Sequence, residues 1–367
     1  GTSTGSSKQQ RFRTLLGNLL FSTRFVTIWI AVALLLIVCK IVAPSTLTST
    51  SWSTLFPTGS IVAVIALGQM LVIMMGGIDL SMGATISLLA NVMVGVSQGQ
   101  NDRLLFATVV VFLFAMLIGL VNGVLVAILE LNPLIVTLST SLILLGITSE
   151  YRLHIANNPK VPEKLSNFVL LEKFLGISKT FWFVLALMLL IGLILRSTTV
   201  GRRFQAVGAN RTAAWVAGIH VRLYVVLAYM AAACAGGLGG ILIGGRVVSP
   251  GVDPGAVYLL GPVATVVLGG AALSGGLASP SSTWVAAFFI TILNRMLAVR
   301  GLSNASQYVV FGLAIILGMV ISGDRIAEII GRLLLRASIR NLISSEDFTD
   351  EQPRQEPVAA TTIHALE

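Results

Sequence analysis

Charged residues are scarce in this sequence. Only 11% of its 367 residues are charged, 55% are hydrophobic, and the mean hydropathy is +0.92, whereas a soluble domain carries about 25% charged residues. A chain this apolar cannot cover its surface with charge in water, but in lipid it has no need to. We therefore predict an all-α polytopic membrane protein.

Cysteine, histidine and nucleotide-binding motifs are also rare or missing. The two cysteines, Cys39 and Cys234, lie inside apolar runs and are interpreted as free thiols. The sequence contains no G-x-x-x-x-G-K-[ST] loop, no H-E-x-x-H motif and no Cys/His cluster at metal-ligand spacing. We therefore expect no catalytic site, metal or cofactor in this chain.

The basic excess is better explained by membrane topology than by nucleic acid. The chain carries 24 Lys and Arg against 15 Asp and Glu, a net charge of +9. In membrane proteins such residues gather at the cytoplasmic ends of spans. We expect membrane lipid, and no nucleic acid, as their partner.

About ten apolar runs approach the roughly 20 residues that cross a bilayer. Several are short or interrupted by glycine, so we expect some broken helices. The candidate spans are Phe25–Val42, Leu55–Met75, Ser81–Val96, Leu104–Leu129, Pro133–Thr148, Phe181–Leu195, Leu223–Ile243, Tyr258–Leu273, Thr283–Val299 and Gln307–Ser322.

An even number of spans places both termini on one side of the membrane. The arginine-rich segment 197–222 falls on that side with the basic segment 1–24, and the Lys/Arg bias assigns this side to the cytoplasm. The polar segment 150–179 is then an external loop, although its net charge of +2 agrees poorly with that rule.

The chain continues beyond the transmembrane domain, 25–324. Segment 325–340 carries Ile and Leu at helical spacing between arginines. It is either an amphipathic helix in the membrane interface or the basic end of the last span. The tail, 341–367, is polar, acidic and contains proline, so we expect it to be disordered.

The sharpest local motif is the octet Gly76-Gly77-Ile78-Asp79-Leu80-Ser81-Met82-Gly83, which separates two spans with almost no linker. Paired glycines permit a break in a helix, and Asp79 and Ser81 are natural caps for the next one. A charged side chain costs about 2.5–3.5 kcal/mol at a span centre on insertion scales. Asp79 therefore either only caps a helix or acts in a translocation path or its gate.

Two internal echoes suggest a repeat. The octet Gly269–Gly276 shares five of eight positions with the first, at an offset of 193 residues. At an offset of 172, Asn122, Leu125, Asn132 and Gly146 pair with Asn294, Leu297, Asn304 and Gly318. The second offset fits an inverted repeat of the kind used by transporters, whereas the first does not, and chance matches are the alternative. The glycines expected to break helices are Gly76, Gly77, Gly83, Gly269, Gly270, Gly275 and Gly276.

The predicted cytoplasmic loop 197–222 contains the segment Gly201–Ile219. Asn210 or Thr212 can cap a short helix that Gly218 ends. With Phe204 and Trp215 exposed, this helix suits a partner's groove; alternatively, the loop only meets lipid headgroups. The residues singled out are Gly201, Arg202, Phe204, Gly208, Asn210, Ala213, Ala214, Trp215 and Gly218.

Four motifs, in this order, resemble the membrane permeases of ribose-type bacterial ABC importers, which take up monosaccharides or the related autoinducer-2. The resemblance runs from the first span to Asp324, and Gly-Gly-Ile-Asp-Leu-Ser is its most specific part. The motifs are Gly76–Gly83, Asn132–Leu138, Gly201–Ile219 and Val266–Gly276.

This resemblance implies three partners in the bacterial inner membrane system. They are a second permease subunit, identical or related; an ATP-binding cassette ATPase that holds ATP and Mg on a separate chain; and an extracytoplasmic solute-binding protein. Gly201–Ile219 would be the coupling loop to the ATPase, and the external loop 150–179 would dock the binding protein.

The sequence departs from the family at two places. Tyr258–Pro262 lacks the acidic residue that usually occurs there, and Leu145-Gly146 stands where Arg-Gly is frequent. Both changes bear on the identity of the solute more than on the class of transporter.

A path for a small polar solute needs hydroxyl and amide partners more than charge. The candidates for the path or gate are Asp79, Ser81, Asn91, Asn122, Thr137, Ser139 and Ser141. The polar ones could equally be helix-packing residues, because Ser, Thr and Asn often bond across membrane helices.

We therefore expect the permease subunit of an ATP-driven importer that works by alternating access. The alternative is a secondary transporter coupled to protons or sodium. Such a transporter usually needs intramembrane carboxylates, and only Asp79 comes close.

Overall fold

The computed structural model describes residues 25, 27–155, 159–303 and isolated positions up to 316, all within the unit Gly1–Gly323. The basic segment 1–24, most of the expected tenth span, segment 325–340 and the tail 341–367 lie outside the described residues. What the sequence analysis expects of those segments stays a prediction.

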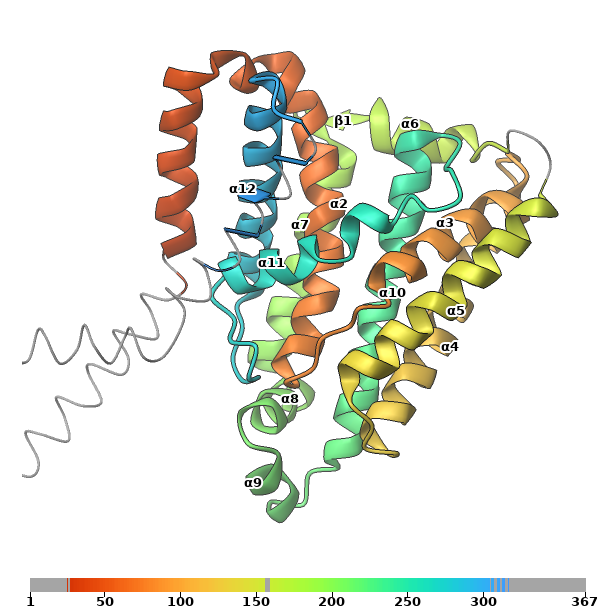
Figure 1. Cartoon of the computed structure of the whole chain (residues 1–367), viewed down its shortest axis with the longest axis vertical. Coiled ribbons are helices and arrows are strands. Elements are labelled where there is room, and N and C mark those ends of the chain that lie inside the picture. The colour runs from red at the N-terminus through yellow and green to blue at the C-terminus, as the bar shows by residue number, and fades with distance from the viewer. Residues whose placement is uncertain are drawn as a thin grey trace, which may run out of the picture. The chain divides into compact units, whose positions relative to one another are not determined.

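Most of the described chain is helical (Figure 1). Among the described residues, six helices are long and apolar enough to cross a membrane: α2 (Ser49–Met74), α4 (Leu104–Ala127), α5 (Pro133–Leu153), α7 (Lys179–Ser197), α10 (Val221–Val247) and α12 (Pro280–Val299).

The shorter elements complete the bundle. Three apolar segments are Thr27–Val42, α3 (Met82–Ser97) and the run Ala256–Leu268, which comprises η2 (Ala256–Tyr258) and α11 (Gly261–Leu268). The others are η1 (Pro44–Leu47), α6 (Glu163–Leu170), β1 (Lys173–Phe174), β2 (Ile177–Ser178), α8 (Thr199–Ala209) and α9 (Arg211–Val216).

The all-α polytopic class is thereby confirmed, but the count of ten spans is not. Six described helices have the necessary length, and three expected spans are shorter. Two of these, α3 and α11, are short because irregular segments with glycine pairs interrupt the chain beside them. The tenth expected span falls outside the described residues.

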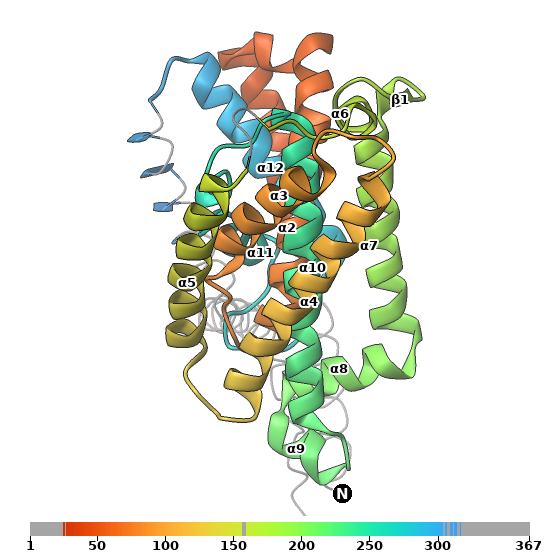
Figure 2. The same ribbon diagram turned by 90° about the vertical axis from the view of Figure 1, so that its right-hand side faces the viewer.

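The bundle has two distinct ends (Figures 1 and 2). We name them the α6 end, where α6 and β1 lie, and the α9 end, where α8 and α9 lie. The central helices α2 and α10 run antiparallel between them, since Gly68 packs against Ala235 and Ile65 against Gly239.

Small residues allow α10 to approach its neighbours closely. A Cβ added at Gly119 of α4 would lie 2.5 Å from the Met230 Cα, and one at Gly123 would lie 2.8 Å from the Val226 Cα. Such backbone contact is how helices associate in lipid, where the hydrophobic effect between helices is weak. In contrast, only 28% of the most apolar window of α4 and 22% of that of α7 are buried, against 78% for α2. The outer helices therefore leave many apolar side chains exposed on the surface of the bundle.

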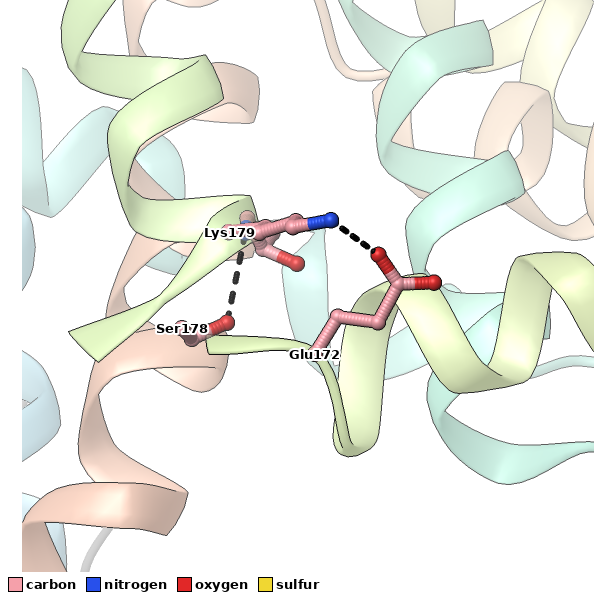
Figure 3. A network of polar contacts seen from close by, with 4 residues as sticks. Glu172, Ser178 and Lys179 are labelled. Atoms are coloured by element: carbon pink, nitrogen blue, oxygen red, sulfur yellow. Dashed lines mark hydrogen bonds and ion pairs between the residues drawn. The ribbon is translucent and has the colours of Figure 1, made fainter. Parts of the chain in front are cut away.

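A short hairpin closes the α6 end. The strands β1 and β2 pair antiparallel just before α7. Lys179 donates to the Glu172 carboxylate at 2.5 Å, and the Ser178 hydroxyl accepts from the backbone of Thr180 at 3.2 Å (Figure 3). These bonds fasten the hairpin to the start of α7.

Element bounds repeat at one of the two sequence offsets. Val221, where α10 begins, follows Ser49, where α2 begins, by 172 residues, and Val299, where α12 ends, follows Ala127, where α4 ends, by the same number. The offset of 193 joins no equivalent elements.

Candidate functional site

The loop between α2 and α3 contains a buried carboxylate. Asp79 is 2% exposed, and its Oδ1 accepts from the backbone N–H of Ser81 at 2.8 Å and from the Ser81 hydroxyl at 2.5 Å. Gln69 of α2 matches the backbone of Asp79: in the amide orientation that satisfies both atoms, it donates to the Asp79 carbonyl at 3.2 Å and accepts from its N–H at 3.1 Å. A buried polar group is tolerated when it is hydrogen-bonded in this way.

A chain of side chains extends from Ser81 across three helices. The Asn122 amide on α4 donates to the Ser81 hydroxyl at 2.9 Å, and Thr140 on α5 donates to the Asn122 carbonyl oxygen at 2.7 Å. Thr137 accepts from the backbone N–H of Leu80 at 3.0 Å. The loop is thus held from α2, α4 and α5. We call this set the Asp79 network: Gln69, Asp79, Ser81, Asn122, Thr137 and Thr140.

The network unites four of the predicted path residues and separates three others. Asp79, Ser81, Asn122 and Thr137 meet in it, whereas Ser139 is exposed on α5. Ser141 is buried on the same helix, and Asn91 lies on α3. Gln69 and Thr140 were missed by sequence reasoning, although Gln69 is conspicuous as an amide amid the apolar residues of α2.

A glycine junction lies beside this loop. Gly76 and Gly275 have positive φ angles of 71° and 93°, which glycine adopts without the Cβ penalty. A Cβ on Gly275 would lie 3.0 Å from the Gly76 N and 3.2 Å from the Gly208 O, and one on Gly76 would lie 3.3 Å from the Ser274 O. The two glycine octets therefore touch, although they are not equivalent positions of a repeat.

The segment containing α8 and α9 joins the same junction. A Cβ on Gly208, in α8, would lie 2.5 Å from the Met74 O, and that carbonyl accepts from the Gly276 N–H at 3.0 Å. The Arg211 guanidinium of α9 donates to the Met75 carbonyl. One segment at the α9 end thus contacts both the end of α2 and the loop after α11. We define the glycine junction as Gly76, Gly208, Gly275 and Gly276.

The local structure of α9 follows its capping residues. Asn210 accepts from the Ala213 N–H at 2.9 Å, so Asn210, rather than Thr212, caps the helix. Gly218, at φ 76°, follows its end. The expected short helix is confirmed, and α8 precedes it as a second helix.

One expectation about this segment is wrong. Trp215 is 71% exposed, as predicted, but Phe204 is only 8% exposed. Phe204 packs edge-on against Tyr224 of α10, with ring centroids 6.4 Å apart, because α8 turns its apolar face toward the bundle. Of the two neighbouring alanines, Ala214 is buried and Ala213 is exposed.

A large groove opens at the α9 end. Its volume is about 940 Å³, and it lies between the α4–α5 loop and the α9–α10 segment. Arg222 and Glu130 form an ion pair at 3.0 Å on its lining, and the exposed Trp215 also borders it.

An extended segment runs along α3. Asn91 donates to the carbonyls of Gly251 and Val252 at 3.1 and 3.3 Å. Ser87 donates to the Asp253 carboxylate and accepts from the Gly255 N–H at 2.8 Å. Irregular backbone at membrane depth requires such partners or a cavity. Asn91 therefore supports a non-helical segment, which the sequence signalled through its Pro and Gly residues.

A second cavity, of about 430 Å³, lies among α2, α10, η2, α11 and α12. We call it the arginine cavity. Its polar lining residues are Thr54, Thr58, Arg246, Tyr258, Thr291, Asn294 and Arg295. The sequence analysis names Tyr258 as part of a departure that bears on the solute and Asn294 only as a repeat position. It missed the two arginines and the three threonines, although Arg295 lies within an expected span, where a charge is itself a sign of function.

Within the described part of the chain, no three His, Cys, Asp or Glu side chains are grouped where they could hold a metal ion. Nor does Asp79 line either cavity.

Comparison with known proteins identifies similar chains. Residues 51–319 match the family described as branched-chain amino acid transport system / permease component. The chain is 28% identical to the ribose import permease protein RbsC of Escherichia coli K12 over 81% of its own length and 92% of that protein. It is 30% identical to RbsC of Bacillus subtilis over 80% and 91%, and 27% identical to the galactose/methyl galactoside import permease protein MglC of E. coli K12 over 82% and 94%. No solved structure matches the chain.

Proposed function

Since the chain belongs to the family of branched-chain amino acid transport system / permease components, we propose that it imports a monosaccharide as the permease subunit of an ATP-driven importer in the bacterial inner membrane. Its similarity to ribose and galactose permeases over nearly their whole length supports this substrate class. The ATPase and an extracytoplasmic binding protein would be separate chains.

The observation that carries the mechanism is that α8 and α9 contact both the end of α2 and the loop after α11. Met74 and Met75 lie at the end of α2, and Gly276 lies in the loop after α11. The Met74 carbonyl accepts from the Gly276 N–H, and the Met75 carbonyl accepts from Arg211. A displacement of α9 would reach both loops at once. This is the arrangement that coupling to a moving partner requires.

We place the ATPase at the α9 end. The exposed Trp215 and Val216, beside the groove of about 940 Å³, offer an anchor for it. The opposite α6 end, with α6 and the hairpin, would then receive the binding protein. In this topology the α9 end and both termini are cytoplasmic.

Alternating access is supported by the arrangement of α2 and α10. They start 172 residues apart, run antiparallel and pack on each other, as expected for an inverted repeat whose halves rock against one another. With the expected tenth span as the counterpart of α5, each half would contain four spans, and Thr27–Val42 and α7 would lie outside the repeat.

The coupling role of α9 can be tested at Ala213, which is exposed, rather than at Ala214, whose burial would confuse docking with folding. We expect Ala213→Asp, reconstituted in proteoliposomes with the ATPase and binding protein, to lower ATP-dependent uptake at least about tenfold, the effect of about 1.4 kcal/mol lost in docking. Ala213→Ser is the matched control and should transport normally.

Two outcomes would contradict the proposal. Unchanged coupling of ATP hydrolysis to uptake in Ala213→Asp would remove the assignment of α9. Uptake that survives nucleotide depletion and follows a proton gradient would favour the secondary transporter instead.

A further inference from the structure

The arginine cavity lies in the half of the bundle toward the α6 end. Its α2 residues, Thr54 to Val62, belong to the first half of that helix, and Arg246 lies in the last turn of α10. At 1.5 Å per residue, Val62 is about 20 Å along α2 from Ser49, so the cavity reaches deep into the bundle. Its walls come from elements that pack side by side, α2, α11 and α12 (Figure 1).

Both arginines of this cavity lack a partner. Among the described residues, neither Arg246 nor Arg295 takes part in an ion pair or donates a hydrogen bond. In comparison, Arg222 pairs with Glu130, and Arg300, near Arg295 on the chain, donates to the Val42 carbonyl. Arg246 is half-buried and Arg295 is exposed in the structure of the single chain, so both guanidinium groups are accessible to a solute, and a guanidinium at membrane depth is costly unless it meets water or an opposite charge.

None of the described residues that line the cavity carries a carboxylate. The acidic residue nearest to Arg246 along the chain, Asp253, accepts instead from Ser87 on α3. The N-terminal turn of α11 adds positive potential, because Gly261 and Pro262 line the cavity and the first N–H groups of a helix lack carbonyl partners within it. The two arginines are therefore the only full charges among the described residues that line the cavity.

The remaining polar groups suit hydroxyls. Thr58 and Thr291 donate their hydroxyl hydrogens to backbone carbonyls at 2.8 and 2.7 Å, so their oxygens are left as acceptors. Asn294 Oδ1 is buried without a hydrogen-bond partner in the described structure. Tyr258 adds a phenol. These groups could bond a solute that carries several hydroxyls.

We propose that the arginine cavity binds a polyhydroxylated solute that carries an anionic oxygen group, a sugar acid or a sugar phosphate, in preference to a neutral sugar. Arg246 and Arg295 hold the anionic group, and the threonines, Tyr258 and Asn294 bond the hydroxyls. The volume of about 430 Å³ lies within the range of small-molecule sites. The assignment of this cavity to the import path rests on the proposed function.

Binding to the permease alone tests the proposal without the ATPase. The full chain, in nanodiscs of neutral lipid, is titrated with D-gluconate, ribose 5-phosphate, D-ribose and D-galactose, and the shift of its thermal unfolding midpoint and the Kd are measured. We expect one or both anionic solutes to bind about tenfold more tightly than the neutral sugars, since hydrogen bonds to charged groups contribute about 1.5–3 kcal/mol. The ratio of gluconate to ribose 5-phosphate identifies the anionic group.

Substitutions locate the binding site. Arg246→Gln and Arg295→Gln should each lose this preference, and Arg295→Lys should keep part of it. The matched control, Arg300→Gln, removes an arginine outside the cavity and should leave binding unchanged.

Three results would overturn the inference: equal binding of neutral and anionic sugars; stabilisation by anionic lipid but by neither anionic solute, which would assign the arginines to headgroups; or a changed oligomeric state of Arg295→Gln with unchanged binding. The proposed function fails separately. ATP-dependent uptake of a neutral sugar that the arginine variants leave intact would refute only the anionic site, and anion binding without ATP-dependent uptake would refute only the importer.

Discussion

The Asp79 network and the arginine cavity place polar groups in the same apolar bundle in opposite ways. In the network, a buried carboxylate and its neighbours satisfy one another from α2, α4 and α5. In the cavity, two arginines and a buried amide oxygen have no partner in the described structure. A polar group in a membrane protein needs a partner. The residues of the Asp79 network, a closed set, bond one another and hold a loop in place. The polar residues of the arginine cavity, an open set, can bond a solute.

This difference separates structural from solute-binding polar residues better than residue type does. Asn122 and Asn294 are both asparagines, and they are separated by the offset of 172 residues. Asn122 is bonded at both of its amide atoms, whereas Asn294 leaves its oxygen unpaired. One position of a repeated framework thus serves stability in one half and, we infer, recognition in the other.

The largest expected effect compares these two asparagines. Asn122→Ala removes the amide that donates to the Ser81 hydroxyl and the oxygen that accepts from Thr140, so we expect a loss of about 2–3 kcal/mol in unfolding free energy. Asn294→Ala should change stability by less than about 0.5 kcal/mol but weaken solute binding. Unfolding measured in detergent checks the first, and the titration in nanodiscs the second. Equal destabilisation by both changes would erase the distinction between closed and open sets.

The sequence predicted the Asp79 network and the glycine junction better than the arginine cavity. The sequence alone indicated the glycine octets, a cap for α9 at Asn210 or Thr212, and the end of that helix at Gly218. Local backbone chemistry determines these features. The contact between the two octets was not, since it depends on packing between positions about 200 residues apart. Polar satisfaction is equally invisible, because whether Asn122 or Asn294 finds a partner depends on neighbouring helices.

The arginine cavity escaped detection for a different reason. The arginines were counted as topology signals at helix ends, which describes Arg246 but conceals Arg295 within an expected span. The extended segment between Ser249 and Gly255 was also assigned no structure, although two prolines and two glycines argued against a helix there. For Arg295 the signal existed in the sequence, and the apolar average of the expected span Thr283–Val299 obscured it.

A second prediction concerns the glycine junction, which belongs to the closed region. In Gly208→Ala the added Cβ would meet the Met74 carbonyl oxygen at 2.5 Å, and overpacking of this kind costs about 1–3 kcal/mol. We expect lower uptake as well, because α8 could no longer keep its contact with both the end of α2 and the loop after α11. The matched control is Gly192→Ala in α7, where nothing lies within 4 Å. If both variants unfold and transport alike, close packing at the junction has no function.

The smallest expected effect decides the role of Asp79. Asparagine is nearly isosteric, and its Oδ1 can accept the same two bonds from Ser81. If Asp79 belongs to a closed structural set, Asp79→Asn should cost less than about 1 kcal/mol in stability and change uptake by no more than about twofold. Asp79→Ala, which removes the acceptor, should be clearly less stable and serves as the comparison. A stable Asp79→Asn protein that no longer transports would show that the charge itself acts in the transport cycle. Asp79 would then act on the transported solute or its movement, as we propose for the residues of the arginine cavity. Satisfied hydrogen bonds would no longer identify a residue as structural.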